Sequence, residues 1–130
     1  MIHLTVVTPQ RKLVDRQVDE VQLPGSEGSF GVLPGHAPLL TTLKVGEIAY
    51  RQGAQTERIA VAWGFVEVLP DRVSVLADMA ERAEDIDVER AIEAKERAEQ
   101  QLRSGGDIDW DRARASLDKA LIRIRVGSGR

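Results

Sequence analysis

The chain has 130 residues, of which 42% are hydrophobic and 30% are charged, and its formal net charge is −3. This length fits one compact domain or a small domain with an appendage, and the composition is globular rather than disordered. The sequence contains no cysteine, which excludes disulfides, thiolate metal sites and cysteine nucleophiles. The negative charge argues against general nucleic-acid binding, which depends on lysine and arginine neutralising phosphates.

The N-terminal segment, MIHLTVVTPQ, lacks the basic region and long apolar stretch of a secretory signal. No later segment approaches the roughly 18 apolar residues that are needed to cross a bilayer. The sequence therefore predicts a cytosolic protein, or one that is peripheral to a membrane-bound complex.

Up to about Asp78, the sequence consists of short segments rich in valine, leucine and isoleucine. Turn residues separate these segments, as in PGSEG, PGHAP, RQGAQ and LPDR. Within a segment, apolar and polar residues alternate, as where Val73 and Val75 follow Arg72 and Ser74. A period of two buries one face of a strand, so two antiparallel sheets packed face to face are expected. We predict a β-sandwich of about eight to ten short strands.

Beyond Ala80 the composition becomes that of a helix, with many alanine, glutamate, arginine and lysine residues. Asp87 is a candidate N-cap of a first helix, and Asp109 of a second, with a glycine-containing break at 104–107. The short link predicts an antiparallel two-helix hairpin. The apolar stripes comprise Val88, Ala91, Ile92, Ala94, Ala98 and Leu102, then Ala113, Leu117, Ala120, Leu121 and Ile124. We divide the chain into a β-sandwich over 1–84 and a helical hairpin over 85–130, whose alanine-rich seam predicts mobility.

Two loops contain candidates for chemistry. The segment PGSEGSFG resembles a phosphate loop, but it lacks the Lys-Ser/Thr ending, and strands are expected on both sides. Its glycines are better explained by a tight turn. His36, in PGHAP, has no recognisable nucleophile or base partner, so a turn or interface role is favoured over catalysis.

Other side chains also have a simpler explanation than catalysis. Asp15, Asp19 and Glu20 are acids that a hydrolase could oppose across a substrate, but solvated strand positions explain them better. The aromatic residues Phe30, Trp63 and Phe65 are expected in the core rather than in a strip that stacks on nucleic-acid bases.

The helical region, which we take to begin at Glu81, contains several basic residues that face common directions. Arg90 and Arg97 share one face of the first helix, and Lys119 and Arg123 are spaced i and i+4 on the second. Four cations near a helix start suit a polyphosphate, whereas ordinary i to i+4 ion pairs, such as Glu93 with Arg97, are the simpler explanation. From Trp110 onward six basic residues outnumber two acidic ones, which favours an acidic partner; they are Arg112, Arg114, Lys119, Arg123, Arg125 and Arg130.

Several motifs in order resemble the epsilon subunit of bacterial F-type ATP synthases along the whole chain. The most specific is LPGSEGSFGVLPGHAPLLTTL at 23–43. It is followed by WGFVEV at 63–68, VSVLAD at 73–78, IDVERAIEAKERAEQQL and DIDWDRARASLDKALIRIRV. The resemblance implies a non-catalytic subunit of the central stalk whose sandwich contacts the gamma subunit and the c-ring.

The resemblance further implies a helical hairpin that either folds against the sandwich or extends toward the alpha and beta subunits and inhibits ATP hydrolysis. Such a subunit couples proton translocation to ATP synthesis and lies at the cytoplasmic face of the bacterial inner membrane, attached only through the complex. Weakly joined helices and a basic last helix agree with this behaviour. Because the chain ends at Arg130, a long inhibitory tail is not expected.

The family motif I/L-D-x-x-R-A, found in members that bind ATP without hydrolysing it, matches this sequence at 86–91. The resemblance therefore implies ATP as a regulatory ligand, with no cofactor required. Lys119 stands where an arginine is expected, so a point charge replaces a planar fork. The implied ATP-binding residues are Glu81, Ile86, Asp87, Arg90, Ala91, Arg97, Lys119 and Arg123.

Three loop residues match polar positions of the family's contact with the c-ring and gamma subunit: Glu27, Ser29 and His36. Ser29 departs from a glutamate that is common there. Two other functions stay open at this point. One is a free-standing ATP-sensing module whose hairpin closes on nucleotide, and the other is a small hydrolytic enzyme that uses His36.

Overall fold

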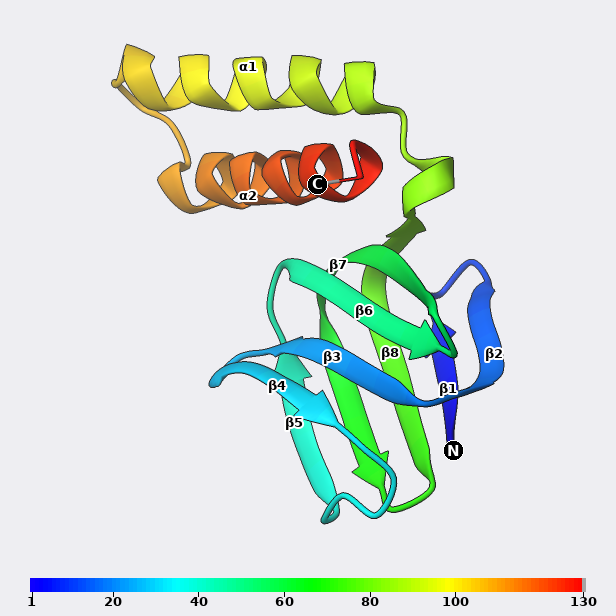
Figure 1. Ribbon diagram of the computed structural model, residues 1–130. Helices are drawn as coiled ribbons and strands as arrows, with labels where there is room; N and C mark the ends of the chain where they lie inside the picture. Colours follow the sequence, from blue (N-terminus) through cyan, green and yellow to red (C-terminus); the bar gives the residue numbers. More distant parts are fainter. Residues whose placement is uncertain (130) are drawn as a thin grey trace.

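The computed structural model describes residues 1–129, and Arg130, which we counted among the basic residues, lies outside the described residues. The chain forms a β-sandwich followed by two helices, which confirms the predicted fold class (Figure 1). The eight strands are β1 (Ile2–Val7), β2 (Lys12–Val18), β3 (Glu20–Gly25), β4 (Gly28–Val32), β5 (Leu39–Leu43), β6 (Gly46–Gln52), β7 (Gln55–Leu69) and β8 (Arg72–Arg82). After a short 3-10 turn, η1 (Ala83–Asp85), come the helices α1 (Val88–Ser104) and α2 (Trp110–Gly127).

The strands pair in the order β2-β1-β8-β7-β5-β3-β4, and β6 bridges β3 and β7. Figure 1 shows β3, β4 and β6 as a layer in front of β1, β8, β7 and β5. Every pair is antiparallel except β1 with β8, which is parallel. The expectation of purely antiparallel sheets is wrong at this one place. No hairpin joins the first and last strands, so no tight turn requires them to run in opposite directions.

The long strand β7 belongs to both layers. Its first half pairs with β6, as Val61 does with Gly46, and its second half pairs with β5, as Gly64 does with Leu43. Between the halves, Trp63 and Gly64 have φ values of 55° and 135°. A β-carbon on Gly64 would come within 2.8 Å of the Ala77 Cα and still closer to the Leu76 carbonyl oxygen. Glycine is therefore required where β7 bends from one layer to the other.

The interior formed by residues 1–129 contains two separate apolar clusters. The large one fills the sandwich with fully buried side chains such as Leu4, Ile48 and Val66. The small one, Ala60, Ile86 and Val126, joins α2 to the sandwich. Because the clusters are separate, the contact that holds the hairpin is small compared with the core that holds the sandwich.

The hairpin is folded back, with α2 against the sandwich and α1 on the far side of α2 (Figure 1). The Asp87 carboxylate accepts a hydrogen bond from the Arg90 N–H at 3.1 Å, and Asp109 accepts one from Arg112 at 3.1 Å. Both predicted N-caps are thus confirmed. The contact between the two helices involves fewer residues than predicted. Of the predicted stripe residues, the buried ones are all alanines: Ala91, Ala98, Ala113 and Ala120. Ile92 and Leu121, which we assigned to the stripes, are 40% and 44% exposed.

Candidate functional site at the junction of sandwich and hairpin

The end of β8 and the last turns of α2 meet at an ion pair. Arg123 donates from Nε to Glu81 Oε1 at 2.6 Å and from its NH2 nitrogen to Oε2 at 3.4 Å. Both side chains are about a quarter exposed, which shields this pair more than the other ion pairs among residues 1–129. Glu81 lies in strand β8, not in a helix as the sequence indicated, because β8 continues its pairing with β7 as far as Arg82.

A second polar contact lies one helical turn earlier on α2. The Lys119 ammonium lies 5.4 Å from the centroid of the Trp63 ring, within range of a cation–π interaction. Trp63 is 38% exposed and Phe65 is 57% exposed, so the prediction that both belong to the core is wrong. The alternation in β7 points these two aromatic side chains outward, while Val66 and Val68 fill the interior.

Apolar packing surrounds the ion pair. Ile86 and Val126 are buried against Ala60, which is paired in register with Glu81. Gly127 comes so close to the chain before α1 that a β-carbon on it would lie 2.8 Å from Val88 Cγ2 and 2.9 Å from Ile86 Cγ2. The sequence indicated neither Trp63 nor Gly127 as a residue of the junction. An apolar pattern does not distinguish an outward aromatic residue, and a glycine at a helix end usually indicates only a cap.

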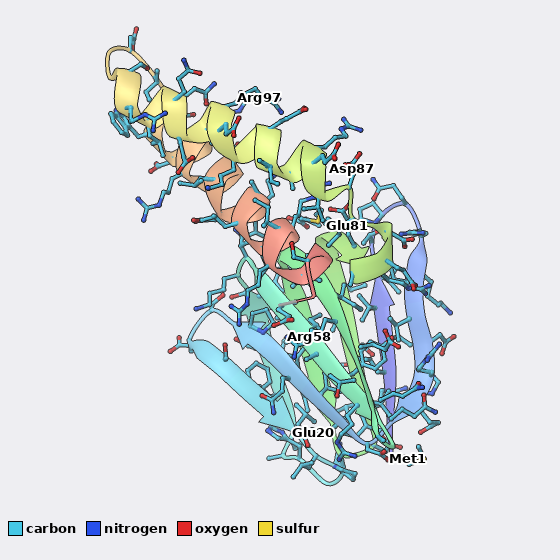
Figure 2. All side chains as sticks on the ribbon, turned by 45° about the horizontal axis from the view of Figure 1, so that its top comes forward. Met1, Glu20, Arg58, Glu81, Asp87 and Arg97 are labelled. Carbon is cyan, nitrogen blue, oxygen red and sulfur yellow. The ribbon has the colours of Figure 1, made fainter. Side chains whose placement is uncertain are left out.

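At the start of α1, the remaining residues of the matched motif have distinct environments. Asp87 uses its carboxylate as the helix cap, and Figure 2 shows it just above Glu81 along the chain path. Arg90 is exposed in the first turn, whereas Ala91 is fully buried in the helix seam. Of these side chains, only Arg90 is therefore a free cation presented to solvent beside a helix N-terminus.

Arg97 lies farther along α1, away from the junction (Figure 2). It lines a groove of about 490 Å³ between the far halves of the two helices, together with Gln101, Asp109, Arg112 and Ser116. The expected pair of Glu93 with Arg97 is not among the ion pairs of residues 1–129. Two other i to i+4 pairs form instead, Lys95 with Glu99 at 3.9 Å and Arg114 with Asp118 at 4.0 Å.

The close approach of Gly127 to Val88 fixes which residues of α1 and α2 lie side by side along the hairpin. Counting about 1.5 Å per residue from this contact, Arg123 lies about 6 Å and Arg90 about 3 Å along the hairpin, and Arg97 lies about 7.5 Å beyond the level of Arg123. The folded hairpin thus brings Glu81, Ile86, Asp87, Arg90, Ala91 and Arg123 to one end of the hairpin. Lys119 lies instead against Trp63 on the sandwich. Arg97 lines the groove between the far halves of the two helices.

The predicted contact residues of the loops lie on other parts of the sandwich. Glu27 and Ser29, from the β3–β4 hairpin, line a shallow pocket with Phe30 and Leu39. His36 lies in the connection between β4 and β5, at the end of the sandwich far from the helices (Figure 1). Its backbone N–H donates to the Leu33 carbonyl at 3.2 Å, as in a turn.

Three large apolar side chains are exposed on the outer face of adjacent strands β5, β7 and β8. They are Leu40, Phe65 and Leu76, with exposed fractions of 72%, 57% and 59%. Phe65 pairs in register with Leu76 and lies opposite Thr42, so these side chains share one face. We call these three residues the outer apolar patch. Such a patch on a small protein indicates a contact surface.

The acids considered for hydrolysis are each engaged with nearby cations. Asp15 contacts Lys12 at 3.0 Å and His3 at 2.5 Å, and hydrogen bonds from Lys12 and then His3 lower its pKa below the usual 3.8. Asp19 and Glu20 both approach Arg51, at 3.5 and 3.7 Å. Elsewhere, burial raises the pKa of Tyr50 above its usual 10.0. These acids therefore serve as partners of strand cations rather than as an opposed pair.

Two further findings concern residues 1–129. They contain no group of three or more histidine, aspartate or glutamate side chains arranged to hold a metal ion. None of their helices is both long enough and apolar enough to span a bilayer. The PGSEGSFG segment forms the tight β3–β4 hairpin, with Gly28 at a φ of 133° and strands on both sides.

The fold and the junction define a class of protein, a β-sandwich that carries a C-terminal helical hairpin. Residues 1–83 match the family model described as ATP synthase, Delta/Epsilon chain, beta-sandwich domain. Residues 84–127 match the model described as ATP synthase, Delta/Epsilon chain, long alpha-helix domain. Together the two models cover nearly all of the chain.

Named relatives agree with these models. The chain is 48% identical over 126 residues to an ATP synthase epsilon chain of Nitratidesulfovibrio vulgaris, covering 96% of this chain and 94% of the relative. It is 50% identical over 124 residues to the ATP synthase epsilon chain of Desulforamulus reducens, covering 95% and 94%. The chain belongs to the ATP synthase epsilon chain family, as the sequence motifs indicated.

Solved structures share the fold. A chain of the Euglena gracilis mitochondrial ATP synthase (OSCP/F1/c-ring) superposes with a TM-score of 0.80 at 24% identity, covering 90% of this chain and 75% of that one. A chain of the Tetrahymena thermophila mitochondrial ATP synthase central stalk and c-ring gives a TM-score of 0.62 at 12% identity, covering 98% and 94%.

Proposed function

We propose that this chain is the non-catalytic epsilon subunit in the central stalk of a rotary ATP synthase. It couples proton translocation to ATP synthesis and restrains ATP hydrolysis through its helical hairpin. The relatives named as ATP synthase epsilon chains support the assignment. The observation that carries it is a complete sandwich with two kinds of exposed contact surface, joined to a hairpin by one small apolar cluster.

The partners follow from these surfaces. We assign the outer apolar patch to the gamma subunit, because a large neighbouring subunit would cover Leu40, Phe65 and Leu76. The loop surface at Glu27, Ser29 and His36 contacts the c-ring, next to the exposed Leu39. In this arrangement the chain lies at the cytoplasmic face of the bacterial inner membrane and reaches it only through the complex.

Docking to gamma can be tested by co-purification. Phe65→Ser and Leu76→Ser remove exposed apolar area and should leave the fold intact, since neither side chain fills the core. Capture of the gamma subunit should fall at least about tenfold, as expected when central apolar side chains of an interface are truncated. Gln52→Ser, which alters an exposed residue on β6, is the control. Undiminished capture by the double variant would refute this assignment.

The hairpin is assigned the regulatory role. It contacts the sandwich through few residues, so a modest difference in affinity shifts it between folded and extended states. The extended hairpin would reach the alpha and beta subunits and block hydrolysis. ATP hydrolysis by the head complex should rise when the bound chain lacks residues 87–130. Equal rates with and without these residues would remove the inhibitory role and leave a role in coupling.

ATP is the proposed regulatory ligand of the folded state, through the matched motif at 86–91 and the cations of α2. The proximity of Glu81, Asp87, Arg90 and Arg123 at one end of the hairpin supports this proposal. Titration of ATP into the isolated chain by calorimetry tests it, with Arg90→Ala as the variant expected to lose binding. No heat at millimolar ATP would refute ligand binding.

A further inference from the structure

A groove of about 530 Å³ lies between α2 and the sandwich, where α2 packs on β6 and β7 (Figure 1). One wall is a single face of α2, because its lining residues recur every three or four positions from Asp111 to Arg125. The other wall is Trp63 of β7 with Lys44 and Val45 of the β5–β6 connection. None of the residues implied for ATP binding lines this groove. Its size is that of a small-molecule site, which commonly has about 300–1,000 Å³.

The middle of the groove has apolar and aromatic surface that the folded chain leaves open. Trp63 is 38% exposed although α2 lies beside it, and Leu121 is 44% exposed. Val45 and Ile122 line the same space and are half-buried. An aromatic ring can lie against Trp63, since offset stacking adds to the gain from burying apolar area. Leu121 offers a second apolar contact to the same ring.

The charged groups that line the groove leave an excess of positive charge at one end. They are Lys44, Arg114, Arg125, Asp111 and Asp118. Arg114 and Asp118 lie 4.0 Å apart and offset each other. Neither Lys44 nor Arg125 belongs to an ion pair among residues 1–129. Asp111 is the remaining acid of the lining, and it lies about 21 Å along the helix from Arg125.

Trp63 has lysine residues next to it on two different elements. The Lys119 ammonium lies 5.4 Å from the centroid of the Trp63 ring. On the sandwich, Leu43 pairs with Gly64, so Lys44 follows beside Trp63 and lines the same groove. A ligand whose ring stacks on the tryptophan can therefore place a negative group against an ammonium.

We propose that this groove binds a small aromatic anion, an aromatic carboxylate or sulfonate, and that the bound anion holds the hairpin folded. The site is composite, because Lys44, Val45 and Trp63 belong to the sandwich, whereas Leu121 and Arg125 belong to α2. Extension of the hairpin separates the two walls, so the anion binds the folded state alone. Its binding free energy then adds to the stability of that state. The inference rests on the proposed mobility of the hairpin and is independent of the proposed ATP site.

Binding is tested by NMR titration of the full chain with naphthalenesulfonate, with the neutral naphthalenemethanol as the matched probe. The indole N–H signal of Trp63 should shift, whereas that of Trp110, which does not line the groove, should stay in place. Naphthalenesulfonate should bind about two- to fivefold more tightly than the alcohol, because exposed cations add a modest electrostatic attraction. Equal affinity for the two probes would overturn the assignment to an anion.

Lys44→Gln and Leu121→Ser alter opposite walls of the groove. Both side chains are exposed in the free chain, so these variants should keep the fold. Each should weaken naphthalenesulfonate binding about two- to fivefold, and Lys44→Gln should also reduce the preference over naphthalenemethanol. Arg125→Gln provides a second charge variant. Leu40→Ser, in the outer apolar patch, is the matched control. Weaker binding in Leu40→Ser alone would place the probe on that patch and overturn the groove site.

Hydrogen exchange tests the effect of the anion on the hairpin. With naphthalenesulfonate at about ten times its Kd, α2 amides that exchange through hairpin opening should exchange about tenfold more slowly. The amide of Val66, inside the sandwich, should keep its rate. Arg90→Ala should retain the slower exchange, because Arg90 does not line the groove, so this test and the ATP titration can fail separately.

Two further results would overturn the proposal. Binding of naphthalenesulfonate without slower exchange in α2 would mean that the sandwich wall binds it alone. Absence of any shift at Trp63, together with protection of the groove amides by the gamma subunit, would assign this surface to that partner instead.

Discussion

Gly127, at the end of α2, lies against Val88, at the start of α1, with no room for a side chain: a β-carbon would be 2.8 Å from Val88 Cγ2. Neither Val88 nor the neighbouring Ile86 can turn away easily, because β-branched side chains are stiff at χ1. The closing of the hairpin onto the junction thus depends on a missing methyl group. The consequence can be measured.

Gly127→Ala should open the folded hairpin. Alanine normally stabilises a helix over glycine by about 1 kcal/mol, whereas overpacking costs about 1–3 kcal/mol. The cost of overpacking should exceed the gain in helix propensity, so the folded hairpin should open. In a Trp110→Phe background, the fluorescence of Trp63 should then change as its contact with Lys119 is lost. Ser128→Ala, at an exposed neighbouring position, is the control. If Gly127→Ala stabilised the folded hairpin, the close contact would have no energetic role.

Val126→Ala should weaken the small apolar cluster without affecting the large one, and so test whether the two are independent. It removes two buried carbon groups, worth about 1.5 kcal/mol, from the small cluster only. Hydrogen exchange should become faster in α2, and the urea midpoint of the sandwich should stay the same. Val66→Ala, the same change within the large cluster, should lower that midpoint instead. A common response of both modules to both variants would show a single cooperative unit.

Gly64→Ala should destabilise the sandwich by about 3 kcal/mol or more. The new methyl would meet the Leu76 carbonyl and the Ala77 Cα at a backbone φ of 135°, so neither rotation nor a side-chain shift relieves it. Gly53→Ala is the matched comparison, because its φ is 62° and its β-carbon would meet open space. That variant should lose only about 1–2 kcal/mol. Urea unfolding of both variants measures the difference, and equal losses would contradict the steric argument.

Asp15 gives the edge of the sandwich a dependence on pH. Hydrogen bonds from Lys12 and His3 lower the pKa of its carboxyl in the folded chain, so the native state binds this proton more weakly than the unfolded chain. The stabilisation is present above pH 3.8 and is lost as the pH falls through the lowered value. Asp15→Asn should be less stable than the original chain at pH 6, and the two should become equally stable once the pH is below the lowered pKa of Asp15.

The control for this pH effect is Asp71→Asn, at an exposed carboxylate in the β7–β8 turn. Its stability difference should not follow the same profile. Because Asp15 is at the surface, added salt should also shrink the difference at pH 6. A difference that persists at acid pH would mean that Asp15 acts through shape rather than charge.

The sequence by itself determined much of this protein. Alternating strands, the change of composition near Ala80 and the caps Asp87 and Asp109 depend on local periodicity and hydrogen bonding, which a sequence contains directly. The motifs at 23–43 and 86–91 indicated the family, which the family models confirm. The start of the helical region was predicted too early, because Glu81, which the composition grouped with the helices, belongs to β8 through its pairing with Ala60.

Only the tertiary structure decided which residues meet. The pairing of Glu81 with Arg123, 42 residues apart, depends on how far α2 folds back along the sandwich. The outward position of Trp63, the clearance at Gly127 and the parallel pairing of β1 with β8 are likewise long-range results. Local sequence patterns encode the period of a strand or helix. They do not encode the register between elements, which packing of the whole chain settles.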